Sequence, residues 1–187
     1  MNWDAVAEES LRVLHEVLTT LRPSIESSAT RVADLLKAGG KLLICGNGGS
    51  AADAQHIAAE LVNRFLLDRR PYAAIALSTD TSILTSVGND FGFEQAFEKQ
   101  VQALGRPGDA LLALTTSGQS PNILRALRAA KEGGLLTLAL TGGTGGQAGE
   151  LADIHLCIAS SRHTPRIQEG HHLLYHLLCE RIEEILR

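Results

Sequence analysis

The sequence predicts an α/β fold, a three-layer sandwich in which a parallel sheet of five strands lies between two layers of helices. Short apolar runs of the kind found in buried strands alternate with longer segments that have helical periodicity. Two of these runs are followed directly by a loop rich in glycine or hydroxyl side chains and then by a helix. Because strands that alternate with helices pair in parallel and are covered on both faces, this order predicts a layered α/β domain.

Composition limits the classes of protein that fit. The 187 residues are enough for one domain with a substantial core, and the net charge of −4 gives no electrostatic reason to expect nucleic-acid binding. No apolar run approaches the ~20 residues of a membrane span, and the N-terminal segment is acidic where a signal peptide is basic. Cys45, Cys157 and Cys179 are widely spaced in apolar runs, which is typical of free thiols. We therefore expect a cytoplasmic protein that binds neither nucleic acid nor membranes.

Two amphipathic helices are expected before the sheet, within residues 1–38. Apolar side chains recur at helical spacing over residues 4–21, and again from Pro23 to the glycine pair at 39–40. Their apolar faces must be covered by something. A partner subunit and the chain's own sheet would both serve, so the sequence leaves this choice open.

The first strand, Leu42–Cys45, runs into the loop Gly46-Asn47-Gly48-Gly49-Ser50. Glycines let a backbone turn sharply and bring its amides close to a ligand. Ser50 is predicted to be the N-cap of the Ala-rich helix that follows. A strand, a glycine loop and a helix N-terminus together favour an anion, because free amides and the helix dipole point at it. This loop is therefore a predicted phosphate site.

The helix after this loop carries a polar stripe. At about 100° per residue, the side chains on this stripe are those of Asp53, His56, Glu60, Asn63 and Arg64. The opposite stripe is apolar and holds Ala54, Ile57, Ala58, Leu61 and Phe65. A solvated polar face is one interpretation of such a pattern. The polar stripe lies two turns below a phosphate-type loop, and this position favours a functional site instead.

The loop also fits the dinucleotide pattern G-x-G-x-x-A through Gly46, Gly48 and Ala51. In that reading, an acidic residue should follow ~20 residues later to bind the ribose. The nearest candidate, Asp80, comes about a dozen residues too late. No Gly-Lys-Ser/Thr follows either, which excludes a Walker A loop.

The other elements are expected in a regular order. The predicted strands lie at 72–77, 110–114, 135–140 and 154–158, and the predicted helices at 79–87, 93–104, 121–132 and 165–186. Polar or flexible loops are expected at 88–92 and 142–146. The loop Thr115–Ser120 offers hydroxyl donors beside the free amides of the next helix, whose first residue is Pro121. A helix cap without a ligand would have the same composition, but two such loops in one domain favour a phosphate site.

The last helix carries an apolar stripe of Ile167, Leu174, Leu178, Ile182 and Ile185. His176 lies opposite this stripe, with Glu169, His172, Glu180 and Glu183 nearby and Gln168 to one side. A solvated face would have the same pattern. If His176 is catalytic, the wheel predicts that it points away from its own core and from its own Glu60, toward a neighbouring subunit.

Several of these motifs, in the same order, resemble the phosphoheptose isomerases of the sugar isomerase (SIS) domain family. The motifs are residues 46–56, Gly88-Asn89-Asp90-Phe91-Gly92, residues 115–122 and Arg166-Ile167-Gln168-Glu169, and the resemblance covers nearly the whole chain. It implies a flavodoxin-like SIS domain over residues 1–187, with 1–38 contributing to an oligomer and 41–187 forming the α/β core. It also implies a homotetramer with active sites at subunit interfaces.

The resemblance further implies conversion of sedoheptulose 7-phosphate to D-glycero-D-manno-heptose 7-phosphate, the first step toward nucleotide-activated heptose for lipopolysaccharide core or other surface glycans. It implies one zinc ion per subunit, bound by His56, Glu60, Gln168 and His176. His163 and His172 are extra histidines near this site. The residues expected to bind the sugar phosphate are Asn47, Gly48, Gly49, Ser50, Glu60, Arg64, Asn89, Asp90, Thr115, Thr116, Ser117, Ser120 and Gln168.

The residues present can perform this reaction. An aldose–ketose isomerase moves one proton between neighbouring carbons and another between their oxygens, with an anchor for the phosphate. We expect Glu60 to be the base for the carbon-bound proton and His176 to be the opposing acid/base. The competing hypothesis is a non-catalytic SIS-domain regulator or a replication-initiator-binding protein. Such a protein has no need of both Glu60 and His176.

Overall fold

The computed structural model describes residues 1–187 and contains one parallel sheet in the order β2-β1-β3-β4-β5. The strands are β1 (Leu42–Gly46), β2 (Ala74–Ala76), β3 (Ala110–Thr115), β4 (Leu136–Gly142) and β5 (Ile154–Ile158). The five-stranded parallel sheet predicted from the sequence is confirmed. Its order reverses between β1 and β3, and in open α/β sheets ligands bind at such a reversal, outside the carboxyl ends of the strands.

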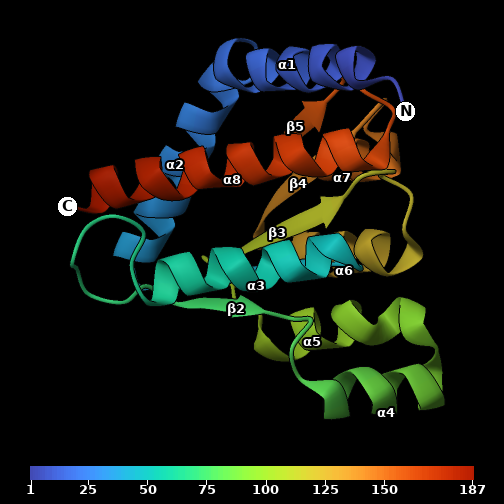
Figure 1. Cartoon of the computed structure of the whole chain (residues 1–187). Coiled ribbons are helices and arrows are strands. Elements are labelled where there is room, and N and C mark those ends of the chain that lie inside the picture. The colour runs from blue at the N-terminus through green and yellow to red at the C-terminus, as the bar shows by residue number, and fades with distance from the viewer.

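The helices fill the connections between the strands and extend both ends of the chain. They are α1 (Trp3–Thr19), α2 (Arg22–Lys37), α3 (Gly49–Val62), α4 (Thr81–Phe91), α5 (Ala96–Leu104), α6 (Pro121–Glu132), α7 (Gly146–Leu151) and α8 (Thr164–Leu186). A 3₁₀ turn, Phe93–Gln95, precedes α5. Figure 1 shows α3 and α8 side by side over one face of the sheet, an arrangement that brings residues far apart in sequence together.

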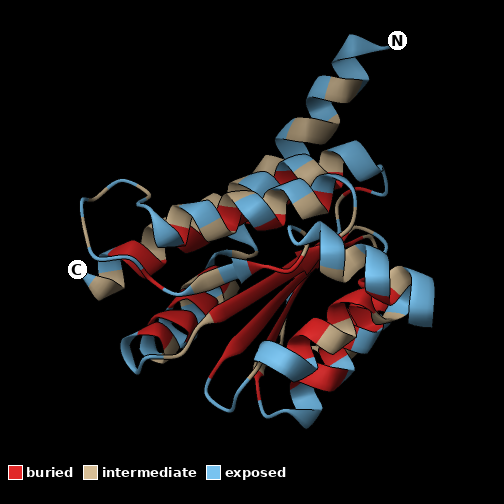
Figure 2. Ribbon diagram, turned by 90° about the horizontal axis from the view of Figure 1, so that it is seen from below, coloured by how far each residue is buried: buried red, intermediate tan, exposed pale blue.

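Two hydrophobic cores lie on opposite faces of the sheet. Successive strand residues point to opposite faces, so Leu42 and Ile44 enter one core while Leu43 and Cys45 enter the other. The first core also contains side chains of α1, α2, α3 and α8. The second contains side chains of α5, α6 and α7. The three-layer architecture follows, with the buried strands in the middle (Figure 2).

The two N-terminal helices are covered in part by their own chain. Helix α2 packs against α8, and α1 crosses α8 and β5. Val13 and Val17 of α1 are buried in the first core. Helix α1 also carries the exposed apolar side chains of Trp3, Leu11 and Leu18. Figure 2 shows the first turns of α1 standing out from the body of the molecule.

Two local predictions were wrong, and one helix was not predicted. The expected loop at 88–92 is mostly the end of α4, because Asp80 caps this helix through Ile83 N and the helix continues to Phe91. Helix α7 was not predicted; it follows the expected loop at 142–146, it forms although glycine disfavours helix, and its Ala148 packs into the second core. The expected strand at 72–77 pairs with β1 only over Ala74–Ala76.

Other expectations concerned thiols and membranes. All three cysteines are free; Cys45 and Cys179 are buried, and Cys157 is partly buried. No helix combines the length and the apolar composition that crossing a membrane would require.

Candidate active site

Two loops meet at the carboxyl ends of β1 and β3, where the strand order reverses. Together with α8 they enclose a pocket of about 270 Å³. Its lining contains most of the residues predicted to bind the substrate: Asn47, Gly48, Gly49, Ser50, Thr115, Thr116, Ser117, Ser120 and Gln168. The N-termini of α3 and α6 adjoin these two loops. Their free amides and positive dipole ends make the pocket suitable for a phosphate.

The first loop turns sharply into α3. Gly48 is the N-cap of this helix and has a φ of 56°, a conformation that glycine adopts readily. Ser50 was predicted to be the N-cap, and this was wrong: it lies buried in the first turn of the helix, with its amide bonded to Asn47 O. The helix therefore begins at Gly49, which itself lines the pocket.

A pair of side-chain amides holds the two loops together. Asn47 Nδ2 donates to Asn122 Oδ1 at 2.9 Å, and Asn122 Nδ2 donates to Asn47 Oδ1 at 2.8 Å. Asn122 is buried at the start of α6. No role was predicted for Asn122, because two asparagines 75 residues apart carry no periodic signal. Their reciprocal contact fixes the separation of the two loops across the sheet.

The polar stripe of α3 lies where its periodicity predicts. Ala54, Ile57 and Leu61 are buried against the sheet, while His56 and Glu60 are only partly buried. His56 Nε2 lies 2.8 Å from Glu60 Oε1, as expected for residues four apart on a helix. An imidazole and a carboxylate are thus held together on the helix that begins at the loop pocket.

His176 does not point away from its own site, and the prediction from the helical wheel was wrong. His176 Nε2 lies 3.4 Å from His56 Nε2 of the same chain. The wheel shows correctly that His176 is off the apolar stripe of α8. However, α8 is flanked by α2 on one side and by α3 on another, so its polar side faces α3. Glu60 and His176 therefore belong to one cluster within a single chain, linked by His56.

A third imidazole, that of His172, joins this cluster. One ligand nitrogen from each of His56, His172 and His176 lies within 4.8 Å of the others. The hydroxyl of Tyr175 lies 2.6 Å from His172 Nδ1, 3.3 Å from His56 Nδ1 and 3.3 Å from Asp53 Oδ1. His172 was expected near the site but without a role, and no role was predicted for Tyr175.

The protonation of this cluster is shifted by its surroundings. Burial lowers the pKa of His176, and the neighbouring His172 and His56 lower it further, which favours a neutral imidazole. Burial also raises the pKa of the Asp53 carboxyl, although the Tyr175 hydrogen bond acts in the opposite direction. A neutral imidazole can both accept and donate a proton, which suits an acid/base role.

The donor set fits a zinc ion. Imidazole nitrogen and carboxylate oxygen are common zinc ligands. With Zn–N bonds of about 2.0–2.1 Å, two nitrogens of a tetrahedral site stand about 3.4 Å apart. His56 Nε2 and His176 Nε2 have this separation in the structure. His56, Glu60 and His176, three of the four ligands that the resemblance implies, are therefore brought together.

Gln168 lies one helical turn before His172 and lines a hollow with it, while three other predicted residues lie outside this cluster. Gln168 lines the pocket between the two loops. Asn89 and Asp90 are exposed at the end of α4, where Asn89 Nδ2 donates to Asp90 Oδ1 at 2.7 Å. Arg64 is exposed beyond the end of α3. Asn89, Asp90 and Arg64 do not line the loop pocket of their own chain.

A buried carboxylate that the sequence did not single out supports the end of α3. Glu183, on α8, accepts hydrogen bonds from the amides of Phe65, Leu66 and Leu67 and from Arg69 Nε. Arg69 in turn donates to the carbonyl oxygens of Glu60 and Leu61. Glu183 and Arg69 therefore connect the last turn of α3, which carries Glu60, to α8. The wheel had placed Glu183 on the polar side of its helix.

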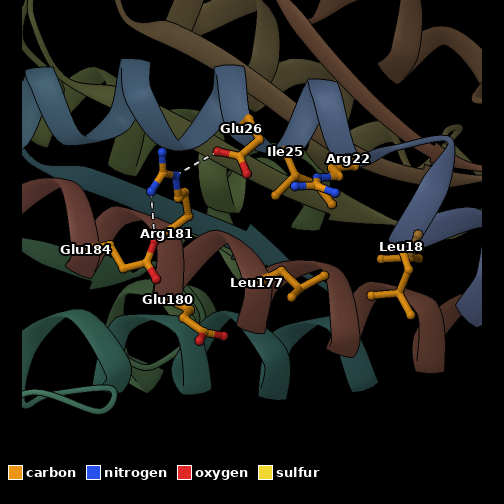
Figure 3. A pocket seen from close by; sticks show the side chains of 9 residues that line it. Leu18, Arg22, Ile25, Glu26, Leu177, Glu180, Arg181 and Glu184 are labelled. Carbon is orange, nitrogen blue, oxygen red and sulfur yellow. Dashed lines mark hydrogen bonds and ion pairs between the residues drawn. The ribbon is translucent and has the colours of Figure 1, made fainter.

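A separate hollow of about 300 Å³ lies between α1, α2 and α8 (Figure 3). Leu18, Ile25 and Leu177 contribute its apolar lining. Arg181 bridges Glu26 and Glu184 at its edge, at 2.7 and 2.8 Å. None of the predicted site residues lines this hollow. It is therefore distinct from the active site.

Comparisons with known proteins place the chain in a family. Its residues 7–142 match the SIS domain family. It is 54% identical over 182 residues to a phosphoheptose isomerase of Aromatoleum aromaticum, covering 96% of this chain and 91% of the relative.

Two solved structures agree with this match. The phosphoheptose isomerase of Francisella tularensis superposes with a TM-score of 0.92 at 42% identity, covering 97% of this chain and 96% of the other. That of Neisseria gonorrhoeae superposes with a TM-score of 0.87 at 43% identity, with the same coverage. At these identities the likeness extends from the fold to the sequence. This chain belongs to the SIS domain family and, within it, to the phosphoheptose isomerases.

Proposed function

We propose that this protein is an aldose–ketose isomerase that converts sedoheptulose 7-phosphate to D-glycero-D-manno-heptose 7-phosphate. The observation that carries the proposal is the position of Glu60, His56 and His176 beside a two-loop pocket suited to phosphate. Membership of the phosphoheptose isomerases supports the same activity. The product would enter the synthesis of nucleotide-activated heptose for lipopolysaccharide core or other surface glycans, in the cytoplasm.

The phosphate is held at the junction of the two loops. Ser117 and Ser120, with Thr116, offer hydroxyl donors from the second loop. The free amides at the start of α3 and α6 add donors and a favourable dipole. A phosphate fixed there leaves the other end of an open-chain sugar free to extend toward the histidine cluster, because a second hollow shares Gly49 and Gln168 with this pocket and is also lined by His172.

The reaction is a pair of proton transfers through an enediol. Glu60 removes the proton from C1 of the ketose, the electrons of that C–H bond form the C1–C2 double bond, and the C2 carbonyl oxygen gains a proton. Glu60 then returns its proton to C2 while O1 loses one and becomes the aldehyde oxygen. Neutral His176 gives and takes the oxygen-bound protons. Fixed positions for both groups supply the proximity that such transfers need.

A zinc ion, when bound, would polarise the substrate oxygens and stabilise negative charge on the enediolate. The residues that would hold it, following the family resemblance, are His56, Glu60, Gln168 and His176. Glu60 then has two tasks, as a ligand and as a base. The hydrogen bonds from Arg69 to the carbonyl oxygens of Glu60 and Leu61 keep the backbone at Glu60 in place for both.

We further propose that the chain functions as one SIS domain in a homotetramer, with residues 1–38 contributing to the contacts and the active sites near subunit interfaces. The exposed apolar side chains of Trp3, Leu11 and Leu18 on the protruding α1 support an assembly. Arg64, Asn89 and Asp90 would then enter a neighbour's pocket. Light scattering at micromolar concentration should give a tetramer; a fully active monomer would contradict the proposal.

The activity is tested by incubating the pure protein with sedoheptulose 7-phosphate and following the aldose product, with and without a metal chelator. Conversion without added enzymes supports the isomerase. Binding of the sugar phosphate without conversion, in samples both treated with chelator and supplied with zinc, would favour a non-catalytic sugar-phosphate-binding protein. Loss of activity on chelation and its return on adding zinc would assign the metal to catalysis.

A further inference from the structure

The side of α1 that packs on α8 carries two carboxylates and a valine. Glu9, Val13 and Glu16 are spaced four and three residues apart, so they share one side of the helix. Val13 is buried, and a Cβ added at Gly170 of α8 would stand 2.7 Å from Val13 Cγ1. The lack of a side chain at Gly170 therefore allows the two helices to cross closely, with one carboxylate of α1 before the contact and one after it.

Glu16 holds the turn of residues 159–163, which connects β5 to α8. It accepts hydrogen bonds from the amides of Ala159 and Ser160 at 3.0 and 3.1 Å, and from the Ser160 hydroxyl at 2.6 Å. Hydrogen bonds to an ionised carboxylate are about twice as strong as those between neutral groups. The first half of the turn is therefore firmly attached to α1.

Glu9 holds the second half of the same turn. It accepts a hydrogen bond from the buried Ser161 hydroxyl at 2.7 Å and lies 2.9 Å from His163 Nδ1. Ser161 Oγ in turn accepts a hydrogen bond from the amide of His163 at 3.0 Å. The contacts with Ser161 and His163 lower the pKa of Glu9, although burial acts in the opposite direction. His163 is the N-cap residue of α8, so Glu9 fixes the backbone where this helix begins.

The first turn of α8 forms one wall of the two-loop pocket. Thr164 follows His163 directly as the first residue of α8, and Gln168 comes four residues later. Both line the pocket that also contains Ser117 and Ser120. The Thr164 side chain is exposed, and its hydroxyl can donate a hydrogen bond to a phosphate oxygen. Thr164 was not among the residues predicted to bind the substrate.

We propose that Thr164 binds the phosphate of the substrate, and that Glu9, assisted by Glu16, is a positioning residue that holds Thr164 in place. Neither carboxylate lines the pocket, so both act through the turn that precedes α8. The inference rests on the proposed function for the identity of the substrate. The competing explanation is that the two carboxylates only attach α1 to the body of the protein, which would change stability but not binding.

The test compares binding, turnover and stability in one set of full-length variants. The variants are Glu9→Ala, Glu9→Gln, Thr164→Val and the double variant that combines Glu9→Ala with Thr164→Val. Glu8→Ala, which removes an exposed carboxylate from the same helix, is the control. KM and kcat are measured with sedoheptulose 7-phosphate, and the Kd of inorganic phosphate is measured by calorimetry. Urea unfolding gives the free energy of unfolding of each variant.

The expected pattern is a loss of binding that passes through Thr164. Thr164→Val should raise KM and the Kd of phosphate by about 10-fold, because a hydrogen bond to a charged group is lost, while kcat stays within about 3-fold. Glu9→Ala should raise both by about 5-fold, because a displaced Thr164 loses part of the same bond. Glu9→Gln keeps an oxygen that can accept from Ser161 and should recover at least half of this loss.

The double variant separates positioning from a merely structural role. Its KM and Kd should match those of Thr164→Val within about 2-fold, because Glu9 and Thr164 act through one contact. Glu8→Ala should stay within about 2-fold of the wild type in all measurements. If Glu9→Ala does not fold, the same comparison is completed with Glu9→Gln.

Three results would overturn the inference. An unchanged KM and Kd in Thr164→Val would remove this residue from the phosphate site. A lower free energy of unfolding in Glu9→Ala with unchanged KM and Kd would show that Glu9 only attaches α1. Losses that multiply in the double variant would show that the two residues act independently. Failure of the isomerase proposal would instead appear as no turnover by a wild-type protein, and the Kd of phosphate would still test the roles of Thr164 and Glu9.

Discussion

His56 and His176 are 120 residues apart in sequence, and their Nε2 atoms lie 3.4 Å apart in one chain. This contact joins α3, which leaves the phosphate-type loop, to α8, which closes the chain. It brings the proposed base, Glu60, and the proposed acid/base, His176, to either side of His56. The cluster of Glu60, His56 and His176 is therefore assembled within one chain, by the packing of α3 against α8.

The first prediction follows from this contact. Glu60→Gln and His176→Ala should each lose most activity, and mixed oligomers of the two should recover none above the parents. Each pocket takes both groups from one chain, so no pocket in the mixture has both wild-type side chains. Subunits are mixed by co-expression or joint refolding, and mixing is verified by differently tagged chains. Recovered activity would show that Glu60 and His176 act across chains.

The second prediction concerns Glu60 alone. Glu60→Gln removes the base while keeping the shape of the side chain, so turnover should fall by at least ~10²-fold, the usual scale for removing a general base. Turnover is measured with the ketose substrate, alongside Glu132→Gln, which changes an exposed carboxylate on α6. Turnover of Glu60→Gln within a few-fold of the wild type would remove this residue from the role of base.

The third prediction assigns the phosphate site. Ser117→Ala or Ser120→Ala should weaken substrate binding by about 1–3 kcal/mol, because each loses a hydrogen bond to a charged phosphate. We expect the weaker binding to raise KM and to affect kcat less, since the phosphate is bound equally in the ground and transition states. Thr144→Ala, in the exposed turn after β4, is the control. An unchanged KM in both serine variants would place the phosphate elsewhere.

The fourth prediction concerns the buried pair of Glu183 and Arg69, whose side chains are 3% and 11% exposed. Glu183→Gln leaves Arg69 without its charged partner, so the free energy of unfolding should fall by about 3–5 kcal/mol. Urea unfolding at pH 7 measures this. Glu184→Gln, next to it in sequence but exposed, should change the free energy of unfolding by less than about 1 kcal/mol. Equal losses in the two variants would contradict the role assigned to Glu183.

The same pair predicts a dependence on pH. Burial alone would raise the pKa of Glu183, but the amides of Leu66, Leu67 and Phe65 and the charge of Arg69 outweigh it, and the pKa is lowered from 4.5. A carboxyl with a lowered pKa stabilises the folded state above its unfolded value, and this stabilisation is lost as the pH falls through the folded value. The difference in stability between wild type and Glu183→Gln should therefore be constant above about pH 5 and shrink below pH 4.5.

The sequence by itself determined the elements whose signals are local. The alternation of apolar runs with helices specified the parallel sheet, and a glycine loop before an Ala-rich helix specified the phosphate-type turn. The stripe of His56 and Glu60 followed from helical periodicity, because neighbours four apart on a helix share a face in any fold.

Only the tertiary structure decided which element packs against each face of a helix. Periodicity identifies the residues that share one side of α8, but not the element that packs against that side. The polar side of α8 faces α3, so His176 meets His56, Tyr175 meets Asp53, and Glu183 is buried against the amides of residues 65–67. These contacts join residues more than 110 positions apart. Such pairs have no periodic relationship in the sequence, because their geometry is set by the packing of two helices on one sheet.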